Sequence, residues 1–98
     1  MRERFSVFRG PRFERSWRRL HEQPGFDLAD LQDLLQVVNF ILESQADDDV
    51  CFPADVDGLR KYRVPPFLRL PTLSFAYFIE GYDVWLVDLS APNDDDRT

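Results

Sequence analysis

The sequence is poor in the residues that build compact chemical sites, with one cysteine, one histidine and four glycines among 98 residues. Because Cys51 stands alone, it excludes an internal disulfide and a cysteine-based metal cluster, and we expect it to be a small buried or half-buried residue. His21 has no second imidazole to complete a site, so we expect an exposed or helix-end histidine. The glycines are isolated, so neither a phosphate-cradling loop nor a nucleophile elbow is present. These absences argue against small-molecule catalysis, and we expect neither a cofactor nor a bound metal.

Long apolar runs are also absent. No run approaches the ~20 residues that cross a bilayer, and the N-terminus lacks the apolar segment of a secretory signal. We therefore expect a cytoplasmic protein without membrane contact. A hydrophobic fraction of 44% and an aromatic fraction of 14% are too high for a disordered chain, and the length suits one domain. We expect that domain to span residues 1–92, followed by an acidic disordered tail over residues 93–98.

The first predicted helix follows a short strand and a Gly-Pro break. Pro11 suits a first helical position, and Phe13, Trp17 and Leu20 recur on one face of the following residues. The opposite face is left to arginines. Pro24-Gly25 then ends the helix.

The second predicted helix is the strongest pattern in the chain. It starts near Asp27, which with Asp30 resembles a capping arrangement of carboxylates and free backbone N–H groups. It should end at about residue 43 or 44. Most of its broad apolar stripe is expected to face the core. The stripe consists of Leu28, Leu31, Leu34, Leu35, Val37, Val38, Ile41 and Leu42.

Four strands complete the predicted fold. Residues 4–8 alternate apolar and polar side chains, and residues 60–64 form a short run that ends at two prolines. Residues 73–79 and 84–89 are rich in β-formers and are separated by a good hairpin turn. The sequence therefore predicts an α+β domain of order β-α-α-β-β-β, with two N-terminal helices packed on a small antiparallel sheet.

The net charge of −6 is strongly segregated along the chain. Residues 1–21 carry seven arginines against two glutamates, whereas residues 22–57 carry ten carboxylates and no lysine or arginine. Residues 58–75 are again basic. Such blocks favour a macromolecular partner through electrostatic steering, although charges that merely solvate the outer faces would look the same. The arginines expected to contact a partner from the first helix are Arg12, Arg15 and Arg19.

The second basic block interleaves its charges with Tyr62 and Phe67. Guanidinium groups bind phosphates and aromatic faces stack on bases, so this composition fits a nucleic-acid surface. It equally fits an acidic protein surface, or an edge strand protected from aggregation by its charges and prolines. The basic residues of this block are Arg60, Lys61, Arg63 and Arg69.

The order of elements and two motifs resemble the RelE/ParE toxin superfamily of bacterial toxin–antitoxin systems. Residues 58–64 read Gly-Leu-Arg-Lys-Tyr-Arg-Val and look like the family's G-L-R-x-Y-R-V strand. Residues 73–79 followed by 84–89 look like its closing hairpin. The resemblance implies either mRNA cleavage on the ribosome or poisoning of DNA gyrase, and neutralisation by a cognate antitoxin. If the chain is a ribosome-dependent mRNA endoribonuclease, the expected catalytic residues are Arg60, Lys61, Arg63, Arg69 and Tyr77, with Tyr62 as an alternative stacking or proton-transfer group.

Three departures from the family weaken the nuclease interpretation. Ser74 stands where the family's nucleases usually carry an arginine, and Arg69 in the preceding loop is the candidate substitute. Residues 90–93 lack the usual histidine, arginine or tyrosine, and the computed pI is near 4.6. A net-negative body opposes binding of a polyanion. The competing interpretation is therefore a non-catalytic acidic protein-binding module or inhibitor with the same fold.

Overall fold

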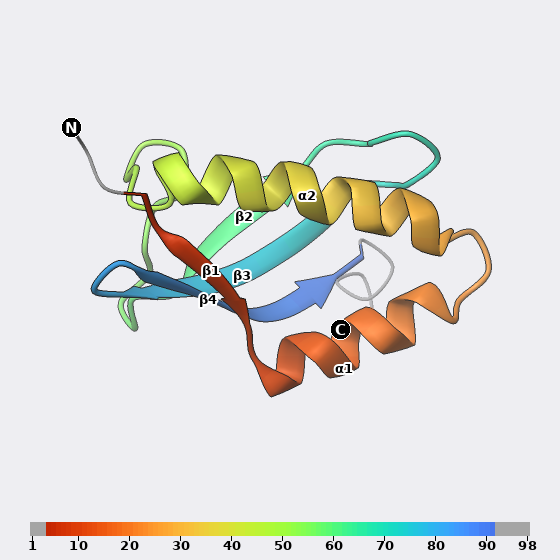
Figure 1. Cartoon of the computed structure of the whole chain (residues 1–98), viewed down its shortest axis with the longest axis horizontal. Helices are drawn as coiled ribbons and strands as arrows, with labels where there is room; N and C mark the ends of the chain where they lie inside the picture. The colour runs from red at the N-terminus through yellow and green to blue at the C-terminus, as the bar shows by residue number, and fades with distance from the viewer. Residues whose placement is uncertain (1–3, 92–98) are drawn as a thin grey trace.

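The computed structural model describes residues 4–91 as one α+β domain with a four-stranded sheet (Figure 1). The predicted class is confirmed, while the predicted tail over residues 93–98 lies outside the described residues. In chain order the elements are β1 (Ser6–Arg9), α1 (Pro11–His21), α2 (Leu28–Gln45), β2 (Arg60–Val64), β3 (Leu73–Glu80) and β4 (Asp83–Ser90).

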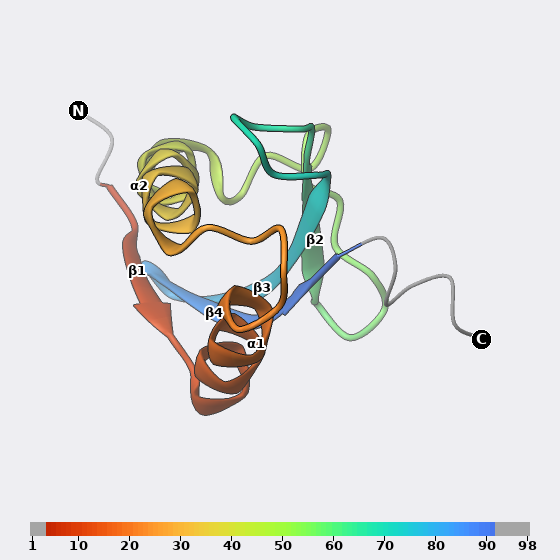
Figure 2. The ribbon, with the colours of Figure 1, turned by 90° about the vertical axis from the view of Figure 1, so that its right-hand side faces the viewer.

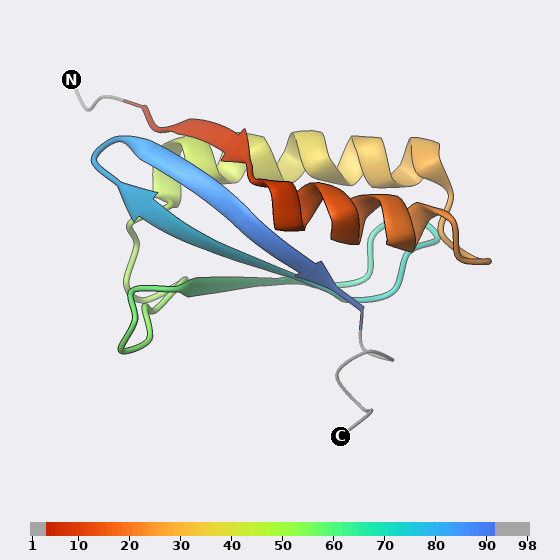
Figure 3. The same cartoon turned by 90° about the horizontal axis from the view of Figure 1, so that it is seen from below.

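The sheet is mixed, which corrects the expectation of a wholly antiparallel one. Its strand order is β1-β4-β3-β2, and β2, β3 and β4 are antiparallel neighbours, but β1 pairs with β4 in parallel. A tight hairpin makes β3 and β4 antiparallel. The connection from β1 to β4 is much longer, since it includes both helices and two strands, and a connection of this kind allows the two strands to pair in parallel. Figure 3 shows β1 starting near the β3–β4 turn and running alongside β4.

Gly10 lets the chain pass close to β4 as it leaves β1. Its N–H donates to the carbonyl oxygen of Leu86 over 2.9 Å, and an added Cβ would lie 3.2 Å from that oxygen. The next residue, Pro11, starts α1, as predicted. Helix α1 therefore lies beside the C-terminal half of β4, where β1 no longer pairs with that strand (Figure 1).

The apolar face of α1 is buried as predicted. Phe13, Trp17 and Leu20 all belong to the core, and the Phe13 ring lies 6.1 Å from that of Phe75 in β3. Figure 2 shows that the two helices occupy separate positions around the sheet. One continuous core nevertheless joins them, because side chains of both helices pack with the same strands.

Helix α2 begins with the predicted cap. The carboxylate of Asp27 accepts hydrogen bonds from the backbone N–H groups of Ala29 and Asp30, over 2.8 and 3.3 Å. Most of the predicted stripe is buried, but Leu28 is 43% exposed and Val37 is 39% exposed. The expectation that most of this face belongs to the core is therefore confirmed, and these two residues are the exceptions.

The loop between α2 and β2 places its apolar side chains differently from our expectation. Cys51 is exposed, whereas the neighbouring Phe52 is buried against Tyr62 and Tyr77. A bulky aromatic ring buries more apolar area than a thiol, so Phe52 occupies the one inward position. His21 ends α1, as expected. No helix within residues 4–91 is long and apolar enough to cross a membrane.

Candidate macromolecule-binding surface

The three antiparallel strands have an inner face on the core and an outer face directed away from it. In β3, Leu73, Phe75 and Tyr77 are buried in the core, so the alternating residues Ser74 and Ala76 face outward. The same alternation applies to β2, where Tyr62 and Val64 contact the core. We call this opposite side the outer sheet face.

Two rows of paired residues cross the outer sheet face. One row joins Lys61, Ala76 and Asp88, and the other joins Arg63, Ser74 and Ser90. Because neighbouring strands lie about 4.8 Å apart, each row spans about 10 Å from β2 to β4. Lys61 and Arg63 are exposed and have no ion-pair partner among residues 4–91. Within residues 4–91, the outer face is thus a floor of small side chains with two cations at one edge that have no ion-pair partner there.

Asp88 connects this face to α1. Its Oδ1 accepts hydrogen bonds from the Ser16 hydroxyl over 2.7 Å and from the Leu89 N–H over 2.9 Å. Its Oδ2 lies 3.4 Å from Nη2 of Arg12. The register of β3 and β4 shifts beside this residue, which lets its side chain reach the helix. The charged residue that interrupts the apolar run of β4 therefore positions α1.

The three predicted partner-binding arginines lie together on α1. Arg12, Arg15 and Arg19 line a groove of about 320 Å³ together with Ser16 and Asp88. Spacings of three and four residues place them on one side of the helix. Arg15 and Arg19 have no ion-pair partner within residues 4–91. This groove and the outer sheet face meet at Asp88, and we call their combination the basic surface.

An aromatic pair extends the outer face toward β1, at the edge of the sheet opposite to Lys61 and Arg63. Phe8 in β1 stacks on Trp85 in β4 with ring centroids 4.9 Å apart, and Phe8 is 41% exposed. Their register neighbours Val7 and Val84 point to the core, so this pair points outward. Sequence reasoning missed the pair because the apolar run of β4 does not reveal which side chains are covered. Register with β1 supplies that information.

The structure does not bring the five predicted catalytic residues together. Arg60 points toward the loop before β2, where its Nη1 donates to the Phe52 carbonyl oxygen over 2.6 Å and lies 2.9 Å from Asp49 Oδ1. Its side chain is only 14% exposed. Residue 60 shares the inner side of β2 with Tyr62, whereas Lys61 is exposed on the outer face. Arg60 therefore fastens the loop instead of presenting a free guanidinium group.

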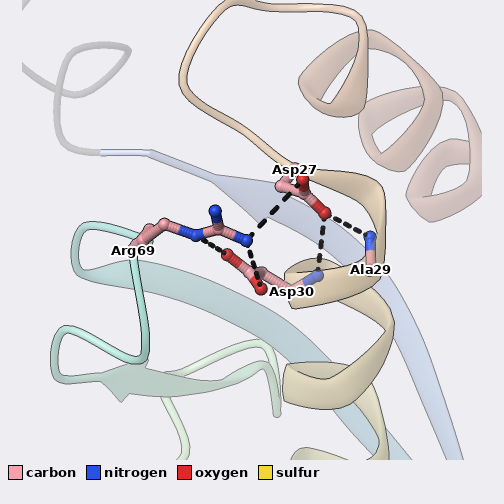
Figure 4. A network of polar contacts seen from close by, with 4 residues as sticks. All are labelled: Asp27, Ala29, Asp30 and Arg69. Atoms are coloured by element: carbon pink, nitrogen blue, oxygen red, sulfur yellow. Dashed lines mark hydrogen bonds and ion pairs between the residues drawn. The ribbon is translucent and has the colours of Figure 1, made fainter.

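Arg69 is engaged with the start of α2 (Figure 4). Its Nε donates to Asp30 Oδ2 over 3.0 Å, its Nη2 donates to Asp30 Oδ1 over 3.3 Å, and Nη2 lies 3.8 Å from Asp27 Oδ2. The hydrogen bonds with Asp30 raise the pKa of the Arg69 guanidinium above its usual range, with the charges of Asp30 and Asp27 adding to the effect. The Asp30 side chain is only 9% exposed, so this fork satisfies a carboxylate that would otherwise be buried unpaired. Arg69 thus fixes its loop to α2.

Tyr77 and Tyr62 lie on the core side of the sheet. Tyr77 is fully buried and its hydroxyl donates to the Ala46 carbonyl oxygen over 2.8 Å. Burial raises the pKa of the Tyr77 hydroxyl well above its usual range, and burial also raises the pKa of Tyr62, whose ring packs 4.8 Å from that of Phe52. A hydroxyl held in this way has no exposed position from which to meet a substrate. Of the five predicted catalytic residues, only Lys61 and Arg63 are exposed without an internal partner within residues 4–91.

The basic surface can bind anions through guanidinium and ammonium groups and can stack flat rings on Phe8. Among residues 4–91, no group of histidine, cysteine and carboxylate side chains could hold a metal ion. No family model, curated protein or solved structure matches the chain. The functional assignment therefore depends on the chain's own residues.

Proposed function

We propose that this protein is a RelE/ParE-like toxin that inhibits bacterial growth by binding an anionic macromolecule through the basic surface. The observation that carries the proposal is the placement of Lys61 and Arg63 opposite the α1 arginines, across a floor of small residues. The β-α-α-β-β-β order along the chain, which the proposed family shares, adds support. The candidate targets are ribosome-bound mRNA and DNA gyrase.

Charge segregation makes such a surface workable on a protein of net charge −6. Residues 22–57 carry ten of the chain's 18 carboxylates. The carboxylates of α2 lie on a different element from α1 and β2, which carry the cations of the basic surface. The cations on α1 and β2 therefore attract phosphates locally, while Asp88 is partly neutralised by Arg12. The exposed Phe8 ring supplies a stacking position for an unpaired base.

In this proposal a cognate antitoxin neutralises the toxin by covering the basic surface. An acidic, partly disordered segment is the simplest complement to Arg15 and Arg19, because it gains order and charge contacts together on binding. The arginine groove is open and lies on a helix of 11 residues, so it can receive an extended strand or an amphipathic helix.

A non-catalytic protein-binding module with the same fold is the second candidate. The internal engagement of Arg60, Arg69 and Tyr77 favours it, because each is held by a carboxylate or a backbone carbonyl. Such a protein would bind an acidic partner on the same basic surface without cleaving it. Induced expression without growth arrest is the outcome that this candidate predicts.

Induced expression in bacteria tests the toxin proposal. Wild type should arrest growth, and the double variant Lys61→Ala with Arg63→Ala should grow normally. Because both side chains are exposed, the far-ultraviolet circular dichroism spectrum and the melting temperature of this variant should stay near those of wild type. Arg18→Ala is the matched control, since Arg18 is exposed on α1 but does not line the groove. This control should remain toxic. Normal growth at high soluble expression of wild type would refute the toxin proposal.

A further inference from the structure

An apolar groove lies on the side of α2 that the sheet does not cover. It has a volume of about 470 Å³ and lies between the helix and the loop that follows β2. The side chains that line it are Asp33, Gln36, Val37, Phe40, Phe67 and Leu68. Phe40 is 67% exposed and Leu68 is 64% exposed. Large apolar side chains grouped in this way on a soluble domain mark interaction sites more often than single exposed ones do.

The backbone of Leu68 is strained in a way that favours this groove. Leu68 and Arg69 form a two-residue turn in which Phe67 and Leu70 exchange both backbone hydrogen bonds, over 3.2 and 2.9 Å. Leu68 has φ of +53°, the left-handed region that leucine avoids and glycine prefers. A glycine would be less strained there, yet the position carries a large apolar side chain that lines the groove. Strain kept at one exposed position indicates that the side chain has a use beyond stability.

Arg69 holds this strained turn in place. Its two hydrogen bonds to Asp30 fasten the turn to the first turn of α2, so the two walls of the groove are fixed to each other (Figure 4). The groove is therefore a preformed site, and a ligand would not have to order the loop on binding.

The charges around the groove define its occupant. Asp33 lines the groove and has no partner among residues 4–91, and residues 22–57 carry no lysine or arginine. The neighbouring Arg69 is occupied by Asp30 and Asp27. A second copy of the chain docking by the same patch would bring its own Asp33 against this one, and like charges disfavour that pairing.

We propose that this groove docks a short apolar segment of another protein that carries lysine or arginine beside its apolar side chains. One or two leucine, isoleucine or phenylalanine residues of that segment fill the space between Phe40 and Leu68, and its cations meet Asp33. The site is distinct from the basic surface in position and opposite in charge. It does not depend on the proposed toxin function.

A displayed peptide library panned against the full chain tests the proposal. Selected peptides should combine apolar and basic residues. Their binding should weaken by about tenfold or more on the variant with Phe40→Ser and Leu68→Asn, since apolar anchors of this kind dominate binding energy. Asparagine tolerates the left-handed backbone, so this variant should stay folded. Val56→Ser is the control because Val56 is fully exposed and outside the groove, and it should bind as wild type does.

Three outcomes of the panning experiment would overturn the proposal. They are selection of acidic peptides, failure to select any peptide, and equal binding of the selected peptides to the Phe40/Leu68 variant. A concentration-dependent dimer of wild type in sedimentation, absent from that variant, would assign the groove to a second copy and would overturn it as well. Asp33→Lys supplies a further check, since it should weaken binding of the basic peptides and strengthen binding of peptides in which glutamate replaces lysine.

Discussion

Replacement of Tyr77 by phenylalanine distinguishes a structural role from a catalytic one. Tyr77 is fully buried, and its hydroxyl donates over 2.8 Å to the carbonyl oxygen of Ala46, which is itself fully buried just after α2. The last carbonyls of a helix have no partner within it, so this hydroxyl satisfies an acceptor that water does not reach.

The loss of stability expected for Tyr77→Phe follows from what the substitution removes. Tyr77→Phe keeps the ring, so no cavity forms and only the hydrogen bond is lost. A lost bond that leaves a buried acceptor unsatisfied costs about 1–3 kcal/mol, and we expect about 1.5 kcal/mol in the free energy of unfolding. In a domain of this size that corresponds to a fall in melting temperature of about 6–12 °C. Tyr77→Ala also removes the ring and should cost about 3–5 kcal/mol.

Urea unfolding at neutral pH, followed by tryptophan fluorescence, measures this difference. The midpoint should fall in Tyr77→Phe with an unchanged slope. A midpoint within error of wild type would refute the capping role. Toxicity provides an independent readout: a catalytic Tyr77 predicts loss of growth arrest at full stability, whereas a structural Tyr77 predicts reduced stability with arrest retained below the melting temperature.

The pH dependence of the same variant has a defined sign. The folded-state pKa of Tyr77 is raised above its unfolded value of 10.0, because burial favours the neutral hydroxyl. The contribution of Tyr77 to stability is therefore complete below about pH 10 and is lost as pH rises above that value. Tyr77→Phe should lose less stability than wild type over this alkaline range, and parallel curves for the two proteins would contradict the assignment.

Two further predictions concern other features of the structure. Leu68→Gly relieves a left-handed backbone that costs about 1–3 kcal/mol and adds a glycine entropy cost of about 0.5–1 kcal/mol. Calorimetry should therefore show an increase of about 1 kcal/mol in the free energy of unfolding, and a destabilised variant would contradict the strain. Asp88→Asn keeps an oxygen acceptor for Ser16 and removes a negative charge from the basic surface. It should therefore stay within about 1 kcal/mol of wild-type stability and elute later from heparin, and earlier elution would contradict the position of this surface.

Local patterns in the sequence determined most of the elements. The period of the apolar residues located α1 and α2, Asp27 located the start of α2, and Gly81 located the turn of the β3–β4 hairpin. These features depend on neighbouring residues, because helix period, capping and a left-handed turn residue act over a few positions of the chain. The grouping of Arg12, Arg15 and Arg19 followed from helix period in the same way.

Tertiary structure alone decided which charged and polar side chains are available. The basic segment of residues 60–69 looks uniform in sequence, yet Arg60 and Arg69 are held by carboxylates from residues distant along the chain or across a loop, while Lys61 and Arg63 stay exposed. Strand alternation separates residue 60 from residue 61, but which side meets the core depends on the position of α2 and Phe52. The parallel pairing of β1 has a similar origin. It depends on where α1 and α2 place the following strands relative to β1, and no local pattern in residues 4–8 determines that arrangement.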